Sequence, residues 1–264
     1  MLLAESAGLG VLVGLVLGAL GGGGAIITVP VLVYLIGMSA HEATTASLVI
    51  VGVSAVIAAI GHARKGNVQF RTGVIFGSLG LIGTLTGSRI SVLVTGDRLL
   101  VAFAVLLVVV AAIMLRKTAK TPPRNEAAAE ATAHPAAPAS PWWLVLAVAT
   151  GVGLLTGFFG VGGGFVIVPA LVLVLRMPMA QAVGTSLVVV TINSAVALAS
   201  RLAGGISLDW PVVLAFTAGA MVAAYAGSHM SSALPARALQ RAFAGLLIVV
   251  ALYTFARSIT GAGI

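Results

Sequence analysis

Two glycine-rich stretches interrupt an otherwise apolar chain, GGGG at Gly21–Gly24 and GVGGG at 160–164. Each is followed by a proline, Pro30 or Pro169, and proline is favoured in the first turn of a helix. Glycine destabilises a helix and uncovers backbone amides. Each stretch therefore predicts a break after which a new helix directs its amide hydrogens and positive dipole end inward, an arrangement that binds anions. The residues assigned to this anion site are Gly21, Gly22, Gly23, Gly24, Pro30, Gly160, Gly162, Gly163, Gly164 and Pro169.

The alternative interpretation of these glycines is close packing of helices, for which small residues are common in membranes. A contiguous glycine run that recurs in the second half exceeds what packing requires. Backbone that leaves a helix at membrane depth must be covered by protein or water, because lipid offers no hydrogen bonds. We therefore favour a cavity lined by the glycines.

Hydroxyl and amide side chains follow each glycine break and could bind an oxyanion. They are Thr44, Thr45 and Ser47 in the first half and Thr185, Ser186 and Asn193 in the second. In membrane helices such side chains also bond their own backbone or a neighbouring helix, so both roles stay open.

Basic side chains inside apolar segments are a further class of candidates. We assign Arg89 and His229 to this class, as possible substrate-attracting groups, since a cation within a membrane segment indicates a functional site. Each lies near a segment end, however, and could extend to the interface instead. No acidic residue lies deep in an apolar segment; Glu42 is a weak candidate for proton exchange, and a helix cap is its favoured role. The coupling ion, proton or sodium, stays open.

The composition identifies the class of protein that must position these residues. Of 264 residues, 60% are hydrophobic and 8% charged, and the mean hydropathy is +1.18. A water-soluble domain has about a quarter of its residues charged. The sequence therefore predicts an all-α polytopic membrane protein whose surroundings are the lipid bilayer. The net charge of +8 lies in short loops, which indicates orientation in a membrane and no nucleic-acid partner.

The chain divides into two related halves of about five apolar segments each, predicting eight to ten membrane helices with glycine-broken or re-entrant hairpins. A shift of 139 residues places Gly21 on Gly160 and Pro30 on Pro169. The first repeat is residues 1–115 and the second is 142–264, and the segment 116–141, rich in Ala, Pro and charge, is predicted to be a flexible linker. Internal duplication is typical of secondary transporters, whose substrate site lies where the repeats meet.

The direction of the repeats depends on whether each glycine break returns the chain to its starting side. If it does, the repeats are inverted, and ten basic residues lie on the side of the linker against three on the other, Arg98, Arg201 and Arg257. A straight crossing gives a weaker division of nine against four. The positive-inside rule therefore favours inverted repeats, both termini outside and a cytoplasmic linker.

The motifs also resemble a known family. GALGGGGAIITVPVLV with ATTASL, and GFFGVGGGFVIVPALV with AVGTSL, are similar to the two glycine-rich signatures of the TauE/SafE family of membrane permeases. The resemblance covers nearly the whole chain apart from the linker. It implies a multi-pass protein of the bacterial inner membrane that carries a small anion, such as sulfite, sulfoacetate or another sulfonate, in either direction.

Other functions are less well supported. The chain has no Walker A sequence, no histidine spacing suited to a metal, and no Ser/His/Asp grouping, so we expect no enzyme, no cofactor and no metal. The alternatives to a transporter of a small anionic substrate are a membrane scaffold or subunit without transport, and an anion channel. The oligomeric state stays open.

Overall fold

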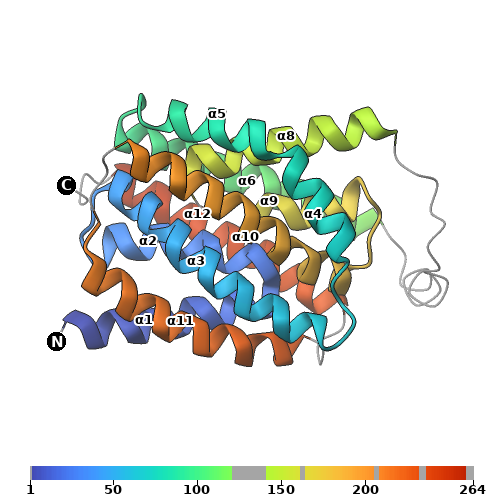
Figure 1. Ribbon diagram of the computed structural model, residues 1–264, viewed down its shortest axis with the longest axis horizontal. Helices are drawn as coiled ribbons and strands as arrows, with labels where there is room; N and C mark the ends of the chain where they lie inside the picture. Colours follow the sequence, from blue (N-terminus) through green and yellow to red (C-terminus); the bar gives the residue numbers. More distant parts are fainter. Residues whose placement is uncertain (1, 121–140, 161–163, 205–207, 232–235, 260–264) are drawn as a thin grey trace.

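The computed structural model describes residues 2–120, 141–160, 164–204, 208–231 and 236–259, and within these ranges the chain is helical with no strand (Figure 1). The elements of the first half are α1 (Leu2–Leu20), the 3-10 helix η1 (Gly21–Gly24), α2 (Ala25–Tyr34), α3 (Ala40–Ala63), α4 (Phe70–Leu79), α5 (Leu81–Ser91) and α6 (Gly96–Lys120). Those of the second half are α8 (Trp142–Phe159), α9 (Gly164–Leu173), α10 (Met179–Ala203), α11 (Trp210–Ser231) and α12 (Ala236–Ile259).

The helices confirm an all-α polytopic membrane protein. Among the described residues, five helices are long and apolar enough to cross a membrane, and six if α4 and α5 form one bent span. The bend between α4 and α5 is 48° and falls at Gly80, which lies between the two helices. Helix α6 extends through Lys120, into the stretch predicted as linker, and residues 121–140 lie outside the described part.

Helices α3 and α10 form the centre of the bundle and run antiparallel. Gln69, just after α3, donates its backbone N–H to Thr185 near the start of α10 at 3.0 Å. At the other end, Arg201 near the end of α10 bonds Thr44 near the start of α3. Figure 1 shows the pair between two outer layers, α1 with α11 on one side and α5 with α8 on the other.

In each half the helix that follows the glycine stretch returns the chain to its starting end. The carbonyl of Gly18, near the end of α1, contacts His62 near the end of α3, so α1 and α3 run in the same direction and α2 leads back between them. In the second half Gly157 near the end of α8 contacts Arg201 near the end of α10, so α9 plays the part of α2.

The outer helix pairs are joined by glycines that let two backbones touch. A Cβ on Gly14 of α1 would lie 2.1 Å from the carbonyl oxygen of Ala220 of α11, and one on Gly83 of α5 would lie 2.0 Å from that of Thr150 of α8. Real Cβ atoms do not approach so closely, so these positions admit only glycine. Small residues on these helices thus serve close helix packing, as is common in membrane proteins.

The two prolines lie deeper in their helices than the sequence predicted. Pro30 and Pro169 are each the sixth residue of α2 and α9 and not part of the first turn. In the first half the reason is that Gly21–Gly24 is itself a 3-10 helix that leads into α2. The turn of the chain falls at its first residue, Gly21, whose φ of +67° is left-handed.

Candidate functional site

A buried arginine at the end of α10 is the centre of the most polar cluster inside the bundle. Arg201 is 2% exposed and donates five hydrogen bonds. One terminal nitrogen bonds Thr44 Oγ1 at 2.6 Å and Thr45 Oγ1 at 3.2 Å. The other bonds Ser91 Oγ at 3.0 Å and the carbonyl oxygens of Gly157 and Phe158 at 2.9 and 3.2 Å. We call these six residues the Arg201 cluster.

The charge of Arg201 has no anionic partner among the described residues. All five acceptors are neutral hydroxyl or carbonyl oxygens, and its Nε is buried without an acceptor. A buried charge is costly unless it is paired, and ionisable groups in membrane segments are typically functional. The cluster therefore combines an uncompensated positive charge with an unused N–H donor.

Four elements position the guanidinium. Helix α8 ends at Phe159, so its last carbonyl oxygens lack helical partners and accept from Arg201 instead. Gly160 then turns the chain with a left-handed φ of +63°, and its carbonyl accepts a hydrogen bond from Ser47 Oγ. Helices α3 and α5 supply the three hydroxyl groups. The broken hairpin of the second half is thus tied to α3 of the first half.

A second cluster lies at the opposite end of the α3–α10 pair, around His62. In the repeat, His62 aligns with Arg201, which lies 139 residues later. Its Nε2 lies 2.9 Å from the carbonyl oxygen of Gly18, and Gly18 aligns with Gly157, which Arg201 contacts. His62 is 0% exposed, and its Nδ1 is buried without a partner.

The glycine breaks lie beside different clusters. A Cβ on Gly160 would lie 2.5 Å from the carbonyl oxygen of Thr44, whereas one on Gly21 would lie 2.9 Å from that of Val183. Because α3 and α10 are antiparallel, the two breaks are at opposite ends of this pair. Helix η1 nevertheless contacts α9, the helix that follows the second break, and one site held between both breaks stays a prediction.

The polar residues that the sequence singled out divide between the two ends. Thr44, Thr45 and Ser47 join the Arg201 cluster or the adjacent break. Thr185 accepts from the backbone of Gln69, and Ser186 Oγ donates to Val183 O at 2.7 Å near Gly21. Asn193 is buried in α10, and its Oδ1 has no hydrogen-bond partner in the described part of the chain.

The remaining glycine candidates lie in or beside the breaks. Gly22 and Gly23 belong to η1; Gly24 is buried just before α2, and Gly164 is buried at the start of α9. Gly162 and Gly163 lie outside the described residues.

The two basic residues that the sequence places within apolar segments lie on the surface of the bundle. Arg89 of α5 and His229 of α11 are both exposed, and His229 Nδ1 lies 3.0 Å from Tyr225 O. Arg201 is not among the site residues predicted from the sequence, because its position near the end of an apolar segment is also typical of an outer loop charge. A signal was available, since Arg201 lies within an apolar segment and aligns with His62 in the repeat.

Glu42 has the role of a helix cap. Its backbone N–H bonds Ser39 Oγ at 3.3 Å, and its carboxylate accepts from the Ser39 backbone N–H at 3.1 Å. This reciprocal pair is a capping box that begins α3. Both groups are used in the cap, so the favoured interpretation from the sequence is confirmed.

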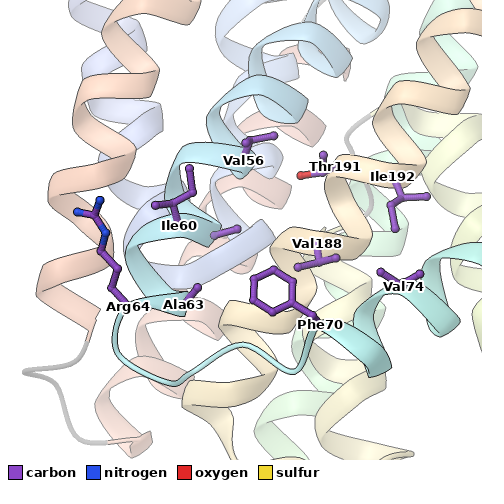
Figure 2. A pocket seen from close by; sticks show the side chains of 10 residues that line it. Val56, Ile60, Ala63, Arg64, Phe70, Val74, Val188, Thr191 and Ile192 are labelled. Carbon is purple, nitrogen blue, oxygen red and sulfur yellow. The ribbon is translucent and has the colours of Figure 1, made fainter.

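An apolar cavity of about 540 Å³ opens between α3, α4 and α10. Figure 2 shows that it is lined by aliphatic side chains and Phe70, with Arg64 at its edge and Thr191 on α10. Arg64 itself donates to Tyr225 Oη at 2.8 Å. A lining with so few donors suits hydrocarbon and not a small oxyanion, so this cavity is not the anion site. A smaller apolar cavity of about 180 Å³ includes Pro30.

Comparisons with known proteins agree with the membrane architecture. The family model described as sulfite exporter TauE/SafE matches residues 6–254. A probable membrane transporter protein of Xylella fastidiosa is 37% identical over 254 residues, covering 95% of this chain and 94% of the relative. The probable membrane transporter proteins YdhB and YunE of Bacillus subtilis are each 25% identical, over 90% and 92% of this chain and 96% and 93% of the relative. No solved structure matches the chain.

Proposed function

The chain belongs to the TauE/SafE family and is a membrane transporter, and from this premise we propose that it carries a small oxyanion, with Arg201 as the anion-binding group. The substrate class that fits is sulfite, sulfoacetate or another sulfonate. A sulfonate or sulfite presents several oxygens to a planar guanidinium, which binds oxyanions through parallel N–H donors.

The observation that supports this proposal is the uncompensated charge of Arg201. The five neutral acceptors stabilise the guanidinium and leave its charge in place. A monoanion near Nε would supply the missing charge and accept from the unused N–H. The hydroxyls of Thr44 and Thr45 are then close enough to contribute further donors by rotating away from the carbonyl of His41, which they now bond.

The proposal includes inverted repeats and an orientation in the bacterial inner membrane. The antiparallel α3 and α10, and the two returning hairpins, are what repeats of opposite topology require. With Arg201 inside the bundle, the outer side keeps two of the three basic residues counted there, against ten on the linker side. This bias supports a cytoplasmic linker and an outer location for the Arg201 cluster.

Two other functions make different predictions. A scaffold would bind no anion, and Arg201 would serve only to cap the carbonyl oxygens of α8. A channel would bind anions weakly, and its flux would neither saturate nor show counterflow. A carrier saturates and exchanges labelled for unlabelled substrate.

The test combines binding and flux. Purified protein is screened by thermal shift against sulfite, sulfoacetate, methanesulfonate, acetate and chloride, since a ligand that binds the folded state raises its melting temperature. The same anions are tested for counterflow in proteoliposomes. We expect a sulfur oxyanion to stabilise the protein and to exchange. No response to any of these anions would overturn the proposal.

The variants Arg201→Lys and Arg201→Gln separate binding from capping. Lysine keeps the charge but loses the planar pair of donors, so we expect the anion-dependent shift to weaken by about tenfold in apparent affinity, the equivalent of one lost charged hydrogen bond. Glutamine should abolish the shift. If both variants only lower the melting temperature and bind the anion as before, Arg201 is a structural cap. Arg89→Gln, on the exposed side of α5, is the matched control.

A further inference from the structure

We propose that His62 binds the proton that moves together with the anion, so that the transporter couples anion movement to a proton. This inference rests on the proposed function and names the ion that the sequence left open. The site is Nδ1 of His62, at the end of the bundle opposite Arg201.

The hydrogen bond of His62 determines which nitrogen can accept the proton. The partner of Nε2 is the carbonyl oxygen of Gly18 at 2.9 Å, and a carbonyl only accepts hydrogen bonds. Nε2 therefore carries the hydrogen of the neutral ring, and Nδ1 carries the lone pair. Nδ1 is buried and has no hydrogen-bond partner, so its lone pair is unused.

The equivalent position in the other half explains why an unused base lies here. Arg201 bonds Gly157 as His62 bonds Gly18, and the aligned residues are 139 positions apart in each case. Where Arg201 meets the hydroxyls of Thr44 and Thr45, the aligned residues on the His62 side are Val183 and Gly184. Neither has a polar side chain, so the imidazole has no second partner.

Close packing fixes the ring in this place. A Cβ on Gly184 would lie 3.1 Å from His62 Cβ and 2.2 Å from the carbonyl oxygen of Asn67. A Cβ on Gly61 would lie 2.0 Å from Ser228 Oγ of α11. His62 thus lies between α1 and α10, and α11 packs against the adjacent Gly61.

The charged and titratable groups near His62 lie at the edge of this enclosure. Among the described residues, Lys65 and His229 act electrostatically on His62, and the Lys65 ammonium donates to the backbone oxygens of Ser228 and His229 at 3.1 and 3.2 Å. Helices α1 and α10 bring only neutral groups to the ring, the Gly18 carbonyl and the Gly184 backbone. Of the titratable side chains named in this paragraph, that of His62 is fully buried.

Protonation gives the two ends of the core the same charge. With His62 neutral, Arg201 is the cation that holds the anion. When Nδ1 takes a proton from water on the side from which the anion enters, the imidazolium becomes a second buried cation, and the anion gains a binding place at the His62 end. When Nδ1 gives that proton to water on the opposite side, the attraction is lost and the anion leaves on the same side, so one proton and one anion cross together.

The test uses methanesulfonate, which stays a monoanion across neutral pH, in proteoliposomes without a membrane potential. Transport with one proton should drive accumulation to about a tenfold ratio for a difference of one pH unit, because a pH unit and a tenfold ratio are equal in free energy. His62→Gln keeps a donor for Gly18 but cannot take up a proton. We expect this variant to keep the anion-dependent thermal stabilisation that Arg201 provides and to lose accumulation driven by pH. Accumulation unchanged in His62→Gln would overturn the inference.

A readout without transport keeps this test separate from the anion proposal. The chain has four histidines, and His62 can be observed by nitrogen NMR in a variant that lacks the other three. We expect Nδ1 to gain a proton as the pH falls and to gain it more readily with methanesulfonate present. If no anion is carried or bound but Nδ1 still titrates, the substrate proposal fails and the proton site stands. An Nδ1 that stays unprotonated down to the pH at which the protein unfolds would exclude the site. In the transport test, His134→Gln in the predicted linker is the control for general loss of a histidine.

Discussion

Arg201 of α10 donates a hydrogen bond of 2.6 Å to Thr44 of α3, and this contact joins the two halves of the chain beside a glycine break. The donor of this hydrogen bond, the guanidinium, is charged, and the acceptor, the hydroxyl oxygen, is neutral. Such bonds contribute about 1.5–3 kcal/mol when the neutral partner is removed. The same threonine lies against Gly160, so its position fixes both the guanidinium and the turn of the second hairpin.

The hydroxyl of Thr44 should therefore affect anion binding. Valine has the shape of threonine without the oxygen, and we expect Thr44→Val to weaken anion-dependent stabilisation by about tenfold or more, from the loss of a charged hydrogen bond. Thermal-shift titration with the stabilising anion measures this. Thr44→Ser keeps the hydroxyl and should bind normally. Thr191, which bonds only Leu187 O of its own helix among the described residues, is the control. An equal effect of Thr44→Val and Thr191→Val would contradict the assignment.

The left-handed turn at Gly160 should be intolerant of a side chain for two separate reasons. Alanine at Gly160 meets the left-handed backbone cost of about 1–2 kcal/mol and places Cβ 2.5 Å from Thr44 O. Gly37 has φ of +84° but open space around its Cβ position, so Gly37→Ala carries the backbone cost alone. We expect Gly160→Ala to lower the melting temperature clearly more than Gly37→Ala. Equal losses in the two variants would show that the contact with Thr44 is absent.

The glycine contact between α1 and α11 makes a prediction about stability alone. At Gly14 an added methyl group would overlap the Ala220 carbonyl, and overpacking of this kind costs about 1–3 kcal/mol. Gly14→Ala should lower the melting temperature of the purified protein, with binding of the anion preserved in the folded fraction. Gly8 of the same helix has nothing within 4 Å, and Gly8→Ala should not lower the melting temperature and should raise it slightly, because alanine favours a helix. A stable Gly14→Ala variant would mean that α1 and α11 are farther apart.

Much of the helix order follows from the sequence, because apolar length and a repeat of glycine signatures depend on local composition. Helix α8 begins and ends where its apolar segment does, at Trp142 and Phe159. The secondary structure of Gly21–Gly24 does not follow from local composition. Low helix propensity predicts an open break, whereas backbone buried in a membrane must bond itself, and the run forms a 3-10 helix that places Pro30 inside α2.

The candidate site was harder to predict than the helices. Thr44 and Thr45 were identified from their place after a glycine break, but their partner Arg201 lies 157 and 156 residues away in sequence. A charge near the end of an apolar segment has the same local pattern in a loop and in the interior. Only the antiparallel packing of α3 and α10, which no single segment encodes, brings Arg201 to the threonines.

The direction of the chain in the membrane gives the last prediction. The protein has no cysteine, so a single introduced thiol reports its own side without background labelling. Thr95 is exposed between α5 and α6, at the end of the bundle that holds Arg201, and Ala133 belongs to the linker outside the described residues. If the Arg201 end is outside, a membrane-impermeant thiol reagent added to intact cells should label Thr95→Cys and should label Ala133→Cys only after permeabilisation. The reverse pattern would place Arg201 on the cytoplasmic side, and labelling of both in intact cells would contradict opposite locations for the linker and the Arg201 end.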